Sequence, residues 1–118
     1  NPNIIETLDR LSELVLDEED YMQNVTEEAF TEILIEQENT KIVLGLKEFN
    51  KLEYVIKTRI IMQTTKILFG TSNGIEKKHV EDIIKLCGNN IGNKFLMPNK
   101  YYKISVKGGK VSFEKLSY

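Results

Sequence analysis

Residues 101–116 read YYKISVKGGKVSFEKL, in which apolar and polar side chains alternate on both sides of Gly108-Gly109. Alternation with period two is typical of a β-strand that buries only one of its faces. Two consecutive glycines accept the positive φ angles that a tight two-residue turn requires. The stretch therefore predicts a β-hairpin, and this hairpin decides the fold class.

The register of the hairpin follows from placing Lys107 opposite Lys110. The other cross-strand pairs then divide by polarity: Val106 with Val111 and Ile104 with Phe113 on an apolar face, Ser105 with Ser112 and Lys103 with Glu114 on a polar face. A hairpin alone is only marginally stable. We therefore expect its apolar face to pack on helices, and residues 40–44 or 94–96 to add a strand.

Residues 1–38 predict one long acidic helix, from about residue 4 to about residue 37. Asn3 and Glu6 have the spacing of a capping box, with Asn3 as the N-cap. Apolar residues recur at helical spacings, at Leu8, Leu11, Val15, Met22, Val25 and Ala29. Such a helix would reach roughly 50 Å, long enough to be a strut toward another part of a longer protein. The alternative is an ordinary core helix that is broken near residues 17–20.

The rest of the chain predicts a short strand at residues 39–46, two helices within residues 47–88 and the hairpin region at residues 93–117. The first of these helices begins at about residue 47 or residue 50 and runs to residue 69, where Gly70 stops it, and the second covers about residues 75–87. Gly88 is predicted to end the second helix as a left-handed residue. Residues 1–118 are therefore expected to form a single α+β domain, mainly helical, with the C-terminal hairpin in a small antiparallel sheet.

The net charge of -2 conceals a division along the chain. Residues 1–40 hold 12 acidic residues and one basic residue, whereas residues 41–118 hold 15 basic and six acidic residues. Such polarity indicates a cationic surface that attracts polyanions. The alternative is that both groups of charges are only solvated faces.

No residue pattern predicts a catalytic or a metal site. His79 is the only histidine, so neither a histidine metal site nor a histidine-based triad is expected. Cys87 is the only cysteine and has no internal disulfide partner, which fits a reducing compartment. The sequence contains no run of about 18 apolar residues, so we expect a cytoplasmic protein without a membrane span.

Three stretches and their order along the chain carry a family resemblance: NPNIIETLDRL at residues 1–11, KKHVEDIIKL at residues 77–86 and GNKFLMPNKYYKISVKGGKVSFEKL at residues 92–116, which includes the hairpin. Together with the helix around Arg59, they resemble the central, substrate-binding part of the tRNA(Ile)-lysidine synthases. Two positions depart from that family's pattern. Met97 interrupts the usual Leu-Pro pair, and Lys103 stands where an arginine is expected.

The resemblance implies a role in an ATP-dependent ligation of lysine to the wobble cytidine of a minor isoleucine tRNA. That family's Ser-Gly-Gly-x-Asp-Ser nucleotide-binding loop has no counterpart in this sequence. We therefore expect a non-catalytic segment excised from a larger enzyme, with ATP and Mg²⁺ bound in a separate catalytic domain of the same chain. The segment's own partner is expected to be the tRNA.

Folded RNA is recognised mainly through its shape, its phosphates and its 2′-hydroxyls, for which lysines on a rigid domain are suitable. The candidate RNA-binding residues are Lys57, Arg59, Lys66, Lys77, Lys78, Lys94, Lys100, Lys103, Lys107 and Lys110, with Tyr101 or Tyr102 as possible stacking groups. RNA binding predicts that these residues converge on one face. A rival function, dimerisation or protein interaction through the long helix, predicts an exposed apolar stripe at Leu8, Leu11, Val15, Met22 and Val25. A small enzyme with an unrecognised site is the third reading.

Overall fold

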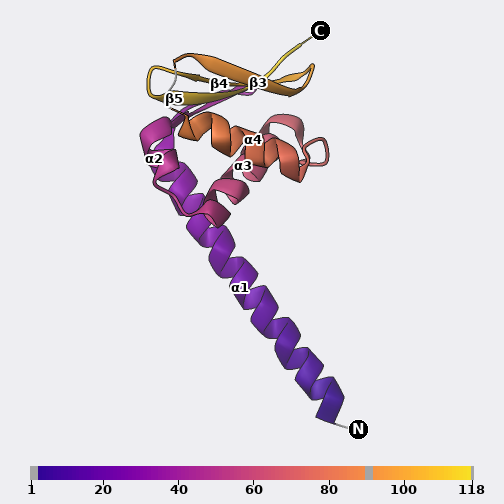
Figure 1. Cartoon of the computed structure of the whole chain (residues 1–118). Helices are drawn as coiled ribbons and strands as arrows, with labels where there is room; N and C mark the ends of the chain where they lie inside the picture. Colours follow the sequence, from indigo (N-terminus) through magenta and orange to yellow (C-terminus); the bar gives the residue numbers. More distant parts are fainter. Residues whose placement is uncertain (1–2, 90–91, 118) are drawn as a thin grey trace.

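The computed structural model describes residues 3–89 and 92–117, and within them helices and a five-stranded antiparallel sheet form an α+β fold. Figure 1 shows the sheet at one end of the molecule, with α2, α3 and α4 on the same side of it and α1 projecting away from the body. The strands are β1 (Leu34–Gln37), β2 (Lys41–Gly45), β3 (Lys94–Asn99), β4 (Tyr102–Lys107) and β5 (Lys110–Lys115). Their order across the sheet is β1-β2-β5-β4-β3.

The predicted hairpin is confirmed in its register. β4 and β5 pair antiparallel with Lys107 opposite Lys110 and Ile104 opposite Phe113. Gly108 and Gly109 form the turn with φ angles of 59° and 76°, as the sequence requires. Both of the candidate additional strands are present, since β2 pairs with β5 and β3 pairs with β4.

Helix α1 (Asn3–Ile33) is continuous through residues 17–20 but ends earlier than predicted. Residues 34–37 form β1 instead, which pairs with β2 through an irregularity after Leu34. The helical spacing of residues 34–37 is overridden because a tight turn, in which the Glu38 amide donates to the Lys41 carbonyl at 2.7 Å, aligns the two strands. The predicted capping by Asn3 concerns a side chain outside the part that the structure describes.

The helix predicted from about residue 47 or 50 to residue 69 is confirmed at its C-terminal end, but the segment is divided into α2 (Leu46–Asn50) and α3 (Tyr54–Phe69). The break allows Phe49 to enter the core, where it is fully buried. It also brings the Asn50 side-chain amide within 2.9 Å of the Cys87 carbonyl, to which it donates near the end of the helix at residues 77–88. These are tertiary contacts, which local spacing does not report.

Helix α4 (Lys77–Gly88) confirms the predicted third helix but not its terminating residue. Gly88 is the last helical residue rather than a left-handed one, and Asn89 follows with an extended conformation at φ -89°. Gly70 does end α3 in the left-handed conformation, at φ 79°. At the start of α4 the Glu76 backbone amide donates to His79 Nδ1 at 3.0 Å, so the only histidine caps its own helix.

The core lies between the helices and one face of the sheet. Its fully buried members include Ile42, Leu44, Phe49, Ile60, Ile61, Ile83, Ile104, Val111 and Phe113. Tyr102 also lies there, with its ring 4.8 Å from that of Phe69 and its hydroxyl 2.9 Å from the Thr65 hydroxyl. Since Thr65 donates to the Ile61 carbonyl, the Tyr102 hydroxyl donates to Thr65. Burial raises the pKa of Tyr102 well above its ordinary value of 10.0.

Candidate nucleic-acid interface

The side of the sheet opposite the helices presents polar and basic side chains. In β4, Lys103, Ser105 and Lys107 alternate with buried residues, so they point away from the core. The same alternation in β5 turns Lys110, Ser112 and Glu114 outward, and cross-strand pairing adds Glu36, Lys41, Val43 and Phe95. We call these ten residues the outer sheet face. Within the described residues, no helix covers it (Figure 1).

Four lysines of the outer sheet face outnumber its two carboxylates. Lys41 and Lys103 lie on either side of Glu114, each as its cross-strand partner. Lys107 and Lys110 are directly opposite each other at the end of the hairpin, and both are exposed. Like charges in direct opposition destabilise a sheet, so this pair favours an anion placed between or above the two ammonium groups. Three of these lysines were predicted as RNA-binding residues, whereas Lys41 was missed because its face depends on pairing with β5.

An exposed aromatic side chain, Phe95, also lies on the outer sheet face. Its cross-strand partner is Ser105, and the Lys103 ammonium group lies 4.9 Å from its ring centroid. A depression of about 270 Å³ is lined here by Asn93, Lys94, Phe95, Lys103, Ser105, Val106 and Lys107. Sequence reasoning missed Phe95. The signal that could have found it is its place one residue before Leu96, which pairs with buried Ile104.

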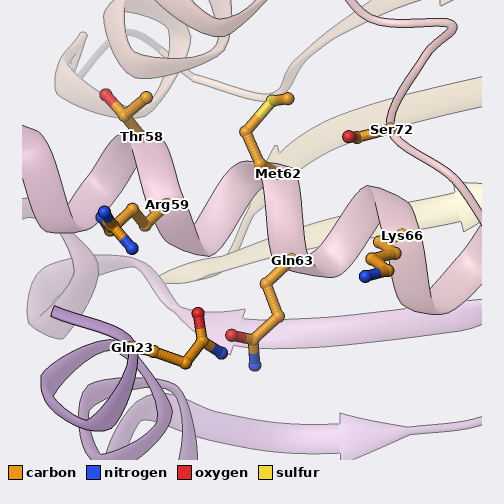
Figure 2. A pocket seen from close by; sticks show the side chains of 7 residues that line it. All are labelled: Gln23, Thr58, Arg59, Met62, Gln63, Lys66 and Ser72. Carbon is orange, nitrogen blue, oxygen red and sulfur yellow. The ribbon is translucent and has the colours of Figure 1, made fainter. Parts of the chain in front are cut away.

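The candidate residues of α3 lie on the helical side of the sheet and not on the outer sheet face. Lys57 is half-buried, with its ammonium group 6.0 Å from the centroid of the buried Phe49 ring. Arg59 and Lys66 line a pocket of about 250 Å³ between α1 and α3, which Figure 2 shows together with Gln23 and Gln63. The structure therefore separates these three cations from the hairpin lysines.

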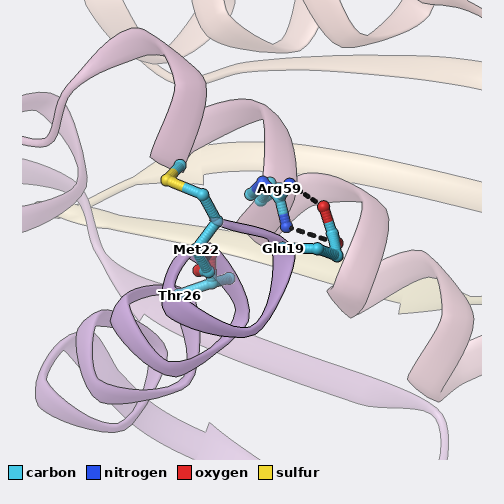
Figure 3. Close-up of polar contacts among 4 residues, drawn as sticks. All are labelled: Glu19, Met22, Thr26 and Arg59. Atoms are coloured by element: carbon cyan, nitrogen blue, oxygen red, sulfur yellow. Dashed lines mark hydrogen bonds and ion pairs between the residues drawn. The ribbon is translucent and has the colours of Figure 1, made fainter. Parts of the chain in front are cut away.

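Arg59 is engaged by the acidic helix. Its Nη1 and Nη2 atoms donate to the two carboxylate oxygens of Glu19, at 3.0 and 2.7 Å (Figure 3). These hydrogen bonds, with the attraction of the opposite charges, hold the pKa of Glu19 below its ordinary value of 4.5. They raise the pKa of Arg59. The contact ties α1 to α3 across 40 residues of sequence.

The remaining candidates lie at three other places. Lys77 and Lys78 are exposed in the first turn of α4, and Lys94 is exposed on the edge strand β3. Lys100 lies in the turn before β4, with its ammonium group 5.1 Å from the ring centroid of Tyr101. Tyr101 is 43% exposed and so accessible for stacking, whereas Tyr102 is 1% exposed and is not. The ten candidates thus do not share one face.

Three further properties of the described residues concern metal ligands, the cysteine and membrane spans. These residues contain no group of three or more His, Cys, Asp or Glu side chains able to hold a metal ion. Cys87 is buried, and burial raises the pKa of its thiol to about 12. No helix of the described part is both long and apolar enough to cross a membrane.

Comparison with known proteins points to one enzyme family. No protein-family model matches the chain. The chain is 31% identical over 96 residues to the tRNA(Ile)-lysidine synthase of Clostridioides difficile, covering 81% of this chain and 21% of that protein. It is 32% identical over 113 residues to the tRNA(Ile)-lysidine synthase of Clostridium perfringens, covering 91% of this chain and 24% of that protein. The tRNA(Ile)-lysidine synthase of Clostridium acetobutylicum is 31% identical over 99 residues, covering 84% of this chain and 21% of that protein. The chain therefore spans less than a quarter of the length of these relatives.

Proposed function

Because the chain belongs, as one segment, to the tRNA(Ile)-lysidine synthase family, we propose that its outer sheet face binds the ribose-phosphate backbone of a tRNA. In this proposal the parent enzyme ligates lysine to the wobble cytidine of a minor isoleucine tRNA in the cytoplasm. ATP and Mg²⁺ bind in its catalytic domain, and the present segment holds the tRNA without taking part in the chemistry.

One observation carries the proposal. Lys41, Lys103, Lys107 and Lys110 lie on a sheet face that no described helix covers, while the acidic α1 leaves the body on the other side (Figure 1). A phosphate backbone is attracted by ammonium groups held at fixed spacing, and binding releases its counterions. The opposed Lys107 and Lys110 pair supports the proposal further, because a phosphate relieves the repulsion between them.

The test is the affinity of the 118-residue chain for a minor isoleucine tRNA over a series of salt concentrations. The variant Lys107→Gln/Lys110→Gln should bind more weakly than the wild type. It should also flatten the slope of log affinity against log salt by about 1.5, the value for two lost phosphate contacts. The comparison variant is Lys77→Gln/Lys78→Gln, which removes the same charge from two exposed sequence candidates on α4 that lie apart from the outer sheet face. Equal losses in the two variants would mean that net charge, and not the outer sheet face, governs binding.

A second candidate function, pairing of α1 with another protein or another copy of the chain, is favoured by a separate observation. Leu8, Leu11 and Val15 are 53–64% exposed, whereas Met22 and Val25, further along the same stripe, pack partly against the core. The exposed apolar residues in the N-terminal half of α1 thus lie on the same stripe of the helix as the residues that pack against the core. Light scattering of wild type and Leu11→Glu tests it: a dimer that the substitution dissociates supports pairing, and a monomeric wild type removes self-pairing.

A further inference from the structure

We propose that Phe95 is a stacking platform for one unpaired nucleobase, so that the outer sheet face takes single-stranded nucleotides as well as duplex backbone. The inference rests on the proposed function. It adds a residue that binds the nucleobase by stacking, whereas the lysines bind the phosphates.

The exposure of Phe95 supports a ligand only because of where the ring lies. Single exposed apolar side chains are ordinary on protein surfaces. Phe95, however, is 61% exposed, and its neighbours on the adjacent strand β4 are Lys103, Ser105 and Lys107. Its cross-strand partner Ser105 is small, so the space beside the ring is not filled by a second large side chain. The Lys103 ammonium group lies over one face of the ring, so a flat ligand would stack on the other face.

The surroundings of the ring match the parts of a nucleotide. The residues that line the depression of about 270 Å³ include Phe95, Asn93, Lys103 and Lys107. A π-face stacks a base of any identity, an amide both donates to and accepts from a base edge, and ammonium groups pair with the flanking phosphates. All three chemistries lie within one depression.

The position of Lys103 shows that the ring already attracts a cation. Its ammonium group, 4.9 Å from the ring centroid, is held by the negative face of the aromatic ring. Because the ammonium group covers that face of the ring, a base stacks on the opposite face, and the positive charge on the ring attracts the phosphates of the bound strand. In a duplex the bases are stacked on each other and their faces are closed, so the site selects unpaired nucleotides.

The experiment uses a fluorescent reporter at the site. The chain has no tryptophan, so Phe95→Trp introduces a single indole whose emission is distinguished from that of the tyrosines by its longer wavelength. A hexauridylate should quench its emission as the base stacks on the indole, and a blunt RNA duplex of the same length should quench it much less. Tyr54→Trp, at an exposed position on α3, is the control and should respond to neither RNA.

Affinity measurements complete the test without relying on fluorescence. Phe95→Ala should weaken hexauridylate binding about tenfold and leave duplex binding unchanged, because stacking on an aromatic side chain contributes about that factor per base. Ile35→Ala removes a comparably exposed apolar side chain at the opposite edge of the sheet and should leave both affinities unchanged. Retained folding is checked by the amide NMR spectrum of each variant.

The outcomes separate this inference from the proposed function. If the wild type binds tRNA with the expected salt dependence but Phe95→Ala binds hexauridylate as the wild type does, stacking is overturned and backbone binding stands. Equal quenching of Phe95→Trp emission by the duplex and by the single strand would also overturn stacking and leave backbone binding in place. If the wild type binds neither RNA, both proposals are overturned.

Discussion

Arg59 shows how a single residue can fit a predicted binding role and yet be engaged inside the fold. Its guanidinium group forms two hydrogen bonds with Glu19 and lies between α1 and α3 (Figure 3). The Glu19 carboxylate takes up two of the five N–H donors of Arg59 and offsets its positive charge, which weakens its attraction for a phosphate. Its role in RNA binding stays a prediction, and the structure assigns it a first role in orienting α1.

The Glu19 contact predicts a pH dependence of stability. The folded pKa of Glu19 is lowered from 4.5, so the unfolded chain takes up the proton first as the pH falls. The stabilisation of the fold by the Glu19–Arg59 ion pair is therefore fully present above pH 4.5 and is lost as the pH falls through the lowered pKa of Glu19 in the folded protein. Glu19→Gln should have a lower melting temperature than the wild type at pH 7, and the difference should shrink in acid.

The control for that prediction is Glu18→Gln, which removes the same charge from the neighbouring exposed position on α1. It should leave the melting temperature close to that of the wild type at pH 7. A destabilisation by Glu18→Gln as large as that by Glu19→Gln would show that the ion pair with Arg59 is not the cause.

Cys87 gives a second prediction at the residue scale. Its thiol is buried with a pKa of about 12, against 9.0 when exposed, so the folded protein should react with iodoacetamide at pH 8 far more slowly than the urea-unfolded chain. Stability should also fall as the pH rises above 9.0, because the unfolded chain then loses the proton first. Mass spectrometry of the alkylated fraction measures the rates, and similar rates in both states would contradict the burial.

At the scale of elements, the two helix-terminal glycines predict opposite responses to the same substitution. Gly70 has a φ of 79°, so Gly70→Ala should lower the free energy of unfolding by about 1 kcal/mol. Gly88 lies inside the last turn of α4, so Gly88→Ala should raise it by about 0.5–1 kcal/mol. An added Cβ meets nothing within 4 Å at either site, so backbone conformation alone decides the sign. Urea unfolding measures both, and a destabilised Gly88→Ala would restore the left-handed assignment.

The elements that could be predicted are those whose structure is determined locally. The β4–β5 register follows from alternation and a glycine turn, which are properties of 14 consecutive residues. The end of α1 could not be predicted, because residues 34–37 have helical spacing and become a strand only by pairing with β2. The same holds for the α2–α3 break, which depends on burying Phe49 and on the bond from Asn50 to α4.

At the scale of the whole molecule, the sheet sorts the predicted site residues by side. Lys103, Lys107 and Lys110 share the outer sheet face, whereas Lys57, Arg59 and Lys66 lie with the helices. The sequence predicted that these residues are charged but not on which side of the sheet each one lies, because that depends on the strand order β1-β2-β5-β4-β3. Lys41 and Phe95 reach the outer sheet face for the same reason. The burial of Tyr102 likewise depends on its contacts with Thr65 and Phe69.

The elongated shape adds a separation of charge to this arrangement. The molecule measures 60 × 32 × 24 Å, and its long dimension follows α1, which has ten acidic residues and one basic residue between Asn3 and Ile33. The free end of this helix points away from the sheet (Figure 1). A polyanion is therefore repelled from one end of the molecule and attracted to the other, which orients it toward the outer sheet face.

The most direct measurement of the central claim is an amide NMR titration of the 118-residue chain with a minor isoleucine tRNA. RNA binding at the outer sheet face predicts that the largest shift changes and line broadening fall on β3, β4, β5 and the Gly108-Gly109 turn. The amides of α1 before residue 20 should be least affected. Perturbations centred on α1 or on the start of α4, with the β4–β5 hairpin unchanged, would contradict the assignment of the RNA-binding surface.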